Sequence, residues 1–172
     1  MTGQPTASPL MAEVGGLSPA ALLHSVALRA DSGAHATEWV GQPAATYLLG
    51  TASDSVGSGR QFVRDTLREW CLGDLTDVAE LVASELVTNA LRHGLPSARR
   101  SPIERPVRLG LLGHAPYVLC TVTDPGCALP VLREVDLAAE SGRGLTVVDA
   151  CSVRWGWHPL DEGGKVVWAL LR

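Results

Sequence analysis

Residues 81–94 read LVASELVTNALRHG, and the rest of the chain is organised around this stretch. We interpret it as the second half of a long helix over residues 76–93, because its apolar residues recur at the spacing of one buried helical stripe. The members of this stripe are Val78, Leu81, Val82, Leu86 and Ala90. Thr76 or Asp77 is expected to cap the start of the helix, and Gly94 is expected to end it.

Polar residues lie on another face of the same helix. Glu85, Asn89 and His93 are each four residues apart, so they share one face close to the buried stripe. An amide oxygen can bind Mg²⁺, and a carboxylate one turn earlier can accept a proton from a hydroxyl group or a water. The alternative is a polar helix edge in contact with solvent, and periodicity alone does not decide between the two.

The composition limits the classes of function. The chain has 172 residues, of which 46% are hydrophobic, enough for one domain with a core. Its formal net charge is −4, which argues against nucleic acid as a partner. No run approaches the roughly 18 apolar residues of a membrane span, and the four cysteines lack metal-binding spacing. We therefore expect a cytoplasmic protein with reduced, mostly buried thiols and no membrane partner.

The two parts of the chain differ in composition. Residues 1–42 are rich in Gly, Pro, Ser, Thr and Ala, and we interpret them as a flexible N-terminal extension of a domain over residues 43–172. That domain has a second predicted helix over residues 55–71, with Ser53 or Asp54 as its cap. The apolar stripe of this helix consists of Phe62, Val63, Leu67, Trp70 and Cys71.

Short apolar and alternating runs predict the sheet. The expected strands cover residues 45–50, 107–113, 117–124, 152–158 and 165–171, and a short helix covers residues 145–150. Asp124 falls on the apolar face of its strand and is expected to point inward, and Val153 is expected to share a face with Trp155 and Trp157. The predicted fold class is α/β: a two-layer α/β sandwich whose mainly antiparallel mixed sheet has helices on one face.

Glycines flank an arginine ahead of the short helix, where residues 141–144 read SGRG. Glycines before a helix start leave backbone N–H groups free to bind an anion. The alternative is a plain tight turn.

Three motifs now follow one another along the chain: Glu85-x-x-x-Asn89 on a helix, Asp124-x-Gly126 after a strand, and Gly142-Arg143-Gly144 before a helix. This ordered set resembles the N, G1 and G2 boxes of the GHKL ATPase superfamily, which has the Bergerat fold. Within that superfamily, residues 84–90 (SELVTNA) are most similar to the bacterial anti-sigma-factor serine/threonine kinases. The resemblance implies that residues 43–172 form a histidine-kinase-like ATPase domain.

The resemblance also implies the cofactors, ATP and Mg²⁺, and a role for each residue of the motifs. Asn89 is the implied Mg²⁺ ligand, which bridges to the phosphates, and Glu85 is the implied catalytic base. Asp124 is the implied acceptor for the adenine amino group, and Gly126 lets the backbone approach the base. The other implied nucleotide-binding residues are Gly142, Arg143, Gly144 and Leu145, which surround the phosphates, and His93, which either touches the phosphates or only complements the helix dipole.

The chain departs from the family pattern at two places. Residues 124–128 read DPGCA, without the second glycine of the usual D-x-G-x-G. The last strand begins with Lys165 where the family often has Gly-Thr-Thr, so a hydroxyl that would support the adenine contact is absent. Lys165 either reaches a phosphate or is a surface lysine at the start of a strand.

The function implied by the resemblance is that of an ATP-dependent protein serine/threonine kinase. Its partners would be ATP or ADP, a small antagonist protein as substrate and, through it, a sigma factor; a homodimer is also possible. One alternative is a non-catalytic module in which bound nucleotide controls docking to a partner. A further alternative is a slow ATPase in which Glu85 activates water.

Overall fold

The computed structural model describes residues 43–50, 54–94, 106–126, 128–131, 143–160 and 163–172. The predicted N-terminal extension over residues 1–42 lies outside the described residues, as does Gly142. No helix within the described ranges is long and apolar enough to cross a membrane.

A five-stranded sheet forms one layer of the domain. Its strands lie in the order β1-β2-β3-β5-β4, and all four pairings are antiparallel, so the described sheet has no parallel pair. Their bounds are Ala44–Leu49 (β1), Val107–His114 (β2), Tyr117–Asp124 (β3), Arg154–Pro159 (β4) and Lys165–Leu171 (β5). Each predicted strand is present, although β4 begins two residues late and leaves Val153 exposed outside it.

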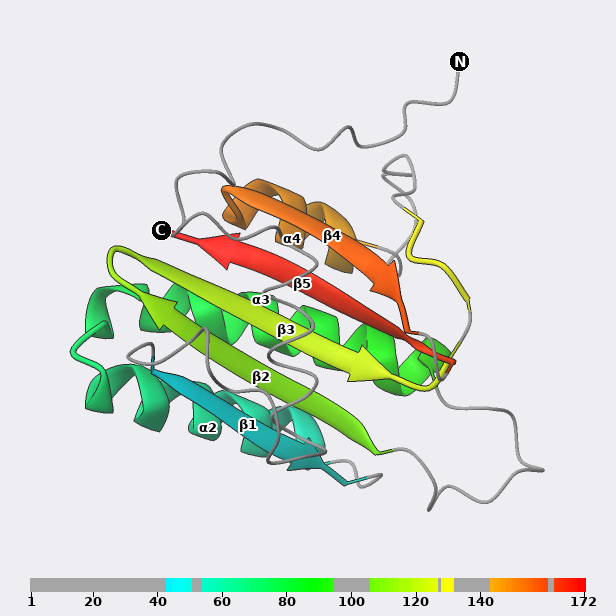
Figure 1. Ribbon diagram of the computed structural model, residues 1–172, viewed down its shortest axis with the longest axis horizontal. Helices are drawn as coiled ribbons and strands as arrows, with labels where there is room; N and C mark the ends of the chain where they lie inside the picture. The colour runs from blue at the N-terminus through cyan, green and yellow to red at the C-terminus, as the bar shows by residue number, and fades with distance from the viewer. Residues whose placement is uncertain (1–42, 51–53, 95–105, 127, 132–142, 161–162) are drawn as a thin grey trace.

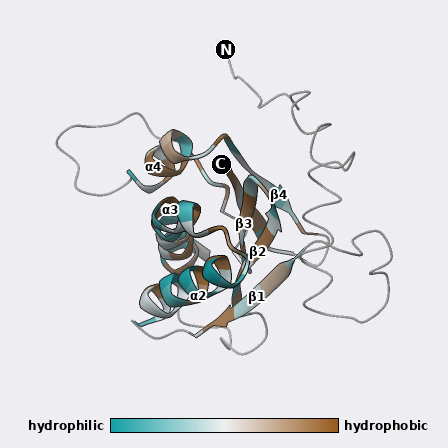
Figure 2. Cartoon of the chain, turned by 90° about the vertical axis from the view of Figure 1, so that its left-hand side faces the viewer, coloured by the Kyte–Doolittle hydropathy of each residue, from teal (hydrophilic) through white to brown (hydrophobic). Residues whose placement is uncertain are grey.

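Three α-helices form the second described layer: α2 (Ser55–Glu69), α3 (Thr76–Asn89) and α4 (Gly144–Cys151). All three lie on the same side of the sheet, with α3 between α2 and α4 (Figures 1 and 2). The predicted two-layer sandwich with helices on one face is therefore confirmed.

The core fills the space between the two layers. Val118, Cys120 and Val122 alternate along β3 toward the helices and are fully buried. Burial of a side chain of this size contributes about 1.5–3 kcal/mol to the stability of the fold. Asp124 continues this row and is only 2% exposed, which confirms that it points inward.

Helix α3 differs from its prediction at both ends. A 3₁₀ turn (Gly73–Leu75) leads into it, and Leu75 takes the N-cap position without a side-chain hydrogen bond, so the predicted cap by Thr76 or Asp77 is wrong. The chain enters α3 already in a helical conformation and leaves no extended residue to act as a cap. At the other end, a π-helical turn (Ala90–Gly94) replaces the last predicted α-helical turn.

The buried face of α3 is also wider than its predicted stripe. Leu81 is 43% exposed, which corrects its place in the stripe, whereas Val82 and Leu86 are buried as expected. Small and β-branched residues fill the rest of the buried face: Ala79, Ala83 and Val87.

Helix α2 ends earlier than predicted. Val63 and Leu67 are buried as expected, but the helix stops at Glu69, and Cys71 is exposed with a φ of 58°. This left-handed conformation turns the chain away, so Cys71 does not belong to the apolar stripe. Asp54 takes the N-cap position as predicted, but its side chain makes no capping hydrogen bond.

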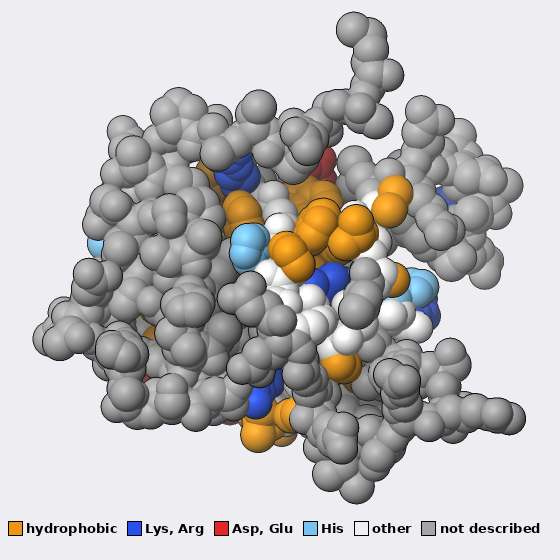
Figure 3. Space-filling model, turned by 45° about the vertical axis from the view of Figure 1, so that its right-hand side comes forward, with side chains coloured by type: hydrophobic (Ala, Val, Ile, Leu, Met, Phe, Trp, Pro, Cys, Tyr) orange, Lys and Arg blue, Asp and Glu red, His pale blue; other side chains and the backbone are white. Residues whose placement is uncertain are grey.

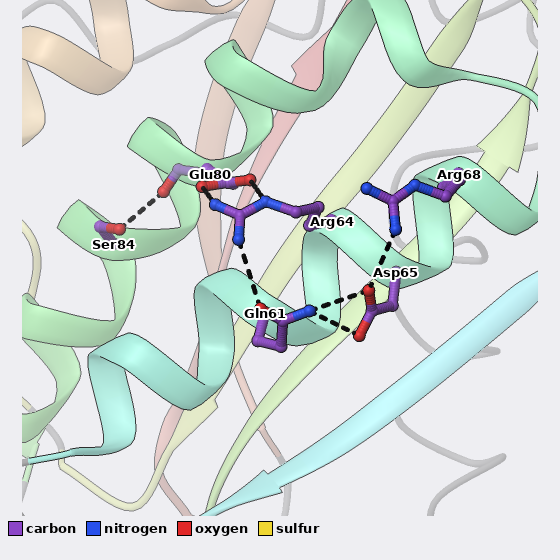
Figure 4. A network of polar contacts seen from close by, with 6 residues as sticks. All are labelled: Gln61, Arg64, Asp65, Arg68, Glu80 and Ser84. Carbon is purple, nitrogen blue, oxygen red and sulfur yellow. Dashed lines mark hydrogen bonds and ion pairs between the residues drawn. The ribbon is translucent and has the colours of Figure 1, made fainter.

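A polar network fastens α2 to α3 (Figure 4). Arg64 on α2 donates two hydrogen bonds to Glu80 on α3, Nε to Oε1 and Nη2 to Oε2, both at 2.8 Å. Gln61 bonds both Arg64 and Asp65, and Ser84 donates to the carbonyl of Glu80. The helix that carries Glu85 and Asn89 is therefore held by ionic contacts on one side as well as by the core below.

Candidate functional site

The start of α4 lies against the polar face of α3. A Cβ atom at Gly144 would be 2.7 Å from Oε2 of Glu85, which is closer than real Cβ contacts, and 3.3 Å from Nδ2 of Asn89. Only a glycine at this position leaves room for both side chains. The structure thus brings together three of the predicted site residues, Glu85, Asn89 and Gly144, from two separate motifs.

Asn89 shows an unusual feature of this cluster. Its Nδ2 is buried and has no hydrogen-bond partner among the described residues. An unpaired buried donor costs about 1–3 kcal/mol, so proteins seldom keep one without a reason. An anionic oxygen fits this donor, and with the amide turned over its Oδ1 fits a magnesium ion.

The described residues contain no group of three or more His, Cys, Asp or Glu side chains able to hold a metal ion by themselves. Asn89 would therefore share a Mg²⁺ with other oxygen donors, and Mg²⁺ is commonly held by one or two protein ligands together with phosphate oxygens. An asparagine oxygen beside a nucleotide phosphate could provide such a ligand.

A second cluster lies where β3 ends and β5 begins. Lys165 donates from Nζ to Oδ1 of Asp124 at 2.8 Å and to the carbonyl of Gly126 at 3.0 Å. The backbone N–H of Gly126 donates to the same Oδ1 at 2.8 Å. Both side chains of the ion pair are buried, with 6% of Lys165 and 2% of Asp124 exposed.

The interpretation of Lys165 as a surface lysine is therefore wrong. Lys165 is not a surface residue, and its ammonium group binds a carboxylate of the protein instead of projecting toward a free anion. The signal that could have placed it is the strand pairing, because Lys165 lies directly opposite Asp124 in the antiparallel register of β3 and β5. Residues directly opposite each other point to the same face of a sheet.

The turn before β5 explains why this pairing is held closely. Gly163 and Gly164 both have a φ of 87°, a left-handed conformation that glycine adopts readily. A Cβ atom at Gly164 would overlap the carbonyl oxygen of Asp124. The two glycines thus allow β5 to start close against the end of β3.

The two clusters lie at the same end of the domain. The turn that follows α3 contacts β3, and Figure 1 shows it beside the end of β3 and the start of β5. Figure 3 turns this side of the molecule forward, and basic side chains are visible among hydrophobic and uncharged ones.

The remaining predicted site residues are placed less closely. His93 is exposed and lies in the π-helical turn, which breaks the four-residue spacing that relates Glu85 to Asn89. Arg143 is exposed at the N-cap position of α4, and Leu145 is half-buried in its first turn.

A model of the histidine kinase-like ATPase domain matches residues 51–170, a range that contains both clusters and the described elements after β1 apart from the last residue of β5. No curated protein matches the chain closely enough to count as a relative.

Proposed function

Since the chain belongs to the histidine kinase-like ATPase domain family, we propose that it is an ATP-dependent protein serine/threonine kinase of the anti-sigma-factor type. Membership confirms the predicted GHKL-type domain and supports the binding of ATP. The kinase activity, the small antagonist protein as substrate and the sigma factor are our proposal, and residues 84–90 support it through their resemblance to that group of kinases.

The observation that carries the proposal is the convergence of Glu85 and Asn89 on Gly144. A site that only bound nucleotide would need the amide of Asn89, but it would not need a carboxylate one helical turn away. A positioned carboxylate near the phosphates is what proton removal from an attacking hydroxyl requires.

In the proposed transfer, the oxygen of a substrate serine or threonine forms a bond to the γ-phosphorus of ATP. The bond from that phosphorus to the oxygen bridging the β- and γ-phosphates breaks, and ADP leaves. Glu85 accepts the proton of the hydroxyl. Asn89 would hold the magnesium ion, whose charge offsets that of the phosphates.

The phosphates would lie near the start of α4. Its first backbone N–H groups have no partner within the helix, and Gly144 gives them close access to the polar face of α3. Arg143, exposed at the N-cap of α4, adds positive charge near the same place. These groups position a triphosphate and offset its charge, which are the main contributions that phosphoryl transfer needs from a protein.

The test is a Glu85→Gln substitution, which keeps the size of the side chain but removes its ability to accept a proton at neutral pH. Wild-type protein incubated with labelled ATP and a lysate should label a small protein, and the variant should label it at least about 10²-fold more slowly. Calorimetry should give the same affinity for Mg·ATP in both proteins.

Glu69→Gln is the matched control, because Glu69 is an exposed glutamate at the end of α2. It should transfer phosphate like the wild type. Equal rates of transfer by the wild type and Glu85→Gln would refute a catalytic role for Glu85. Nucleotide-dependent binding of a partner without transfer by any of the proteins would contradict the kinase and favour a binding module.

A further inference from the structure

The buried ion pair between Lys165 and Asp124 needs an explanation beyond stability. Lys165 is the only lysine of the chain, and it is almost fully buried. Removing two charges from water carries a large free-energy cost for each ion, and replacing such a pair with apolar residues of similar volume is often neutral or stabilising. A buried ion pair at the end of a candidate ligand site is therefore better explained by what it can bind.

Among the described residues, the pair has more hydrogen-bond donors and acceptors than partners. An ammonium group has three N–H donors, and Lys165 directs two of them to Asp124 and Gly126. Both hydrogen bonds that Asp124 accepts on its side chain from described residues end on Oδ1. Within the described residues, one donor of Lys165 and the oxygen Oδ2 of Asp124 are left, next to each other.

The ion pair also lies on the face of the sheet that points toward the helices. Asp124 and Lys165 continue the rows of β3 and β5 that point toward the helices, with Val122 and Val167 as their buried neighbours in the core. The donor and the acceptor are therefore presented between the sheet and the helices, at the end of the domain where the turn after α3 contacts β3.

We propose that Lys165 is a specificity-determining residue of the nucleotide site, which donates a hydrogen bond to N1 of adenine while Asp124 accepts one from the N6 amino group. The proposal rests on the proposed binding of ATP. An acceptor and a donor stand side by side on this edge of adenine, in the order that complements a lysine next to a carboxylate.

The first test uses the unaltered chain. Calorimetry should show that 1-deaza-ATP, which has a carbon in place of N1, binds at least about tenfold more weakly than ATP, since the loss removes a hydrogen bond to a charged donor. GTP presents an acceptor where adenine has its amino group, and it should bind more weakly than ATP as well. Equal affinity of the wild type for ATP and 1-deaza-ATP would overturn the proposal.

The second test asks whether the contribution of N1 to binding depends on Lys165. Lys165→Met removes the ammonium group but keeps an unbranched chain, and it should weaken ATP at least about tenfold while leaving 1-deaza-ATP almost unchanged. An indirect effect through Asp124 would weaken both nucleotides equally and would refute a contact with N1. Tighter binding of ATP to Lys165→Met would show that Lys165 blocks the site instead.

The stability of the variant is controlled separately. Lys165→Met leaves a buried carboxylate without its partner, so the double variant Lys165→Met with Asp124→Asn removes both charges and should unfold at a higher temperature than the single variant. The double variant should have the same affinity for ATP as for 1-deaza-ATP. If the wild type binds ATP but these comparisons fail, only the role of Lys165 is refuted; if it binds no ATP, the proposed function is refuted too.

Discussion

Gly144→Ala places a single methyl group in a closely packed part of the candidate site. The new Cβ atom would be 2.7 Å from Oε2 of Glu85 and 3.3 Å from Nδ2 of Asn89. Carbon and oxygen atoms that are not bonded prefer a separation of about 3.5 Å, so the carboxylate has to move by several tenths of an ångström or α4 has to shift. Because the amide of Asn89 lies beside it, both predicted functional groups are displaced.

The size of the effect differs between stability and function. Overpacking costs about 1–3 kcal/mol, but alanine gains up to about 1 kcal/mol over glycine in a helix, so the net loss of stability should be about 0–2 kcal/mol. Displacement of a catalytic group by about 1 Å can reduce the rate about 10²-fold. Phosphoryl transfer should therefore fall about 10–100-fold while most of the protein stays folded.

The assay compares the rate of transfer from labelled ATP with the melting temperature of the same preparation. Gly57→Ala is the matched control, because a Cβ atom at Gly57 on α2 would have nothing within 4 Å. It should be as active as the wild type and equally or more stable. Wild-type transfer by Gly144→Ala, or a loss no larger than the unfolded fraction explains, would refute the packing of Gly144 against Glu85.

Two further predictions concern the scaffold. Arg64→Ala and Glu80→Ala should each lower the free energy of unfolding, and a double-mutant cycle measured by urea unfolding should give a coupling energy of about 0.5–1 kcal/mol for this pair. The exposed pair Arg68–Asp65, which is 3.8 Å apart, should give almost none. Equal coupling energies for the two pairs would contradict this prediction. Burial raises the pKa of Cys120 from 9.0 to about 12, so its thiolate forms in the unfolded chain first, and stability should fall by up to about 1.4 kcal/mol per pH unit between those values. Cys120→Val should lose this part of the pH dependence; an unchanged slope would show that other groups cause it.

The sheet was predictable because its signals are local. Alternating apolar residues gave β3 its bounds, and the same alternation placed Asp124 on the inner face. The central parts of the helices could be predicted equally well, since the period of apolar residues places Val82 and Leu86 in the core. Their ends could not, because the 3₁₀ turn before α3 and the π-helical turn after it depend on how neighbouring elements pack.

The candidate site was predictable in part for the same reason. Glu85 and Asn89 lie one helical turn apart, so the sequence alone brings them together. Their contact with Gly144 joins residues more than 50 positions apart and requires α4 to pack against α3. Lys165 was misread for a similar reason, because its partner is 41 residues away across a strand pairing that composition and periodicity do not specify.

Asn89→Leu tests the central claim, that the polar face of α3 binds a magnesium nucleotide, most directly. Leucine has the same number and branching of side-chain heavy atoms as asparagine but no donor to leave unpaired, so the substitution should keep or raise the melting temperature by removing the buried Nδ2. Calorimetry with Mg·ATP should show binding to the wild type and a loss of at least about tenfold in the variant. The account predicts that Asn89 lowers the stability of the protein but is needed for the binding of Mg·ATP. Unchanged affinity in a variant that is equally or more stable would contradict it.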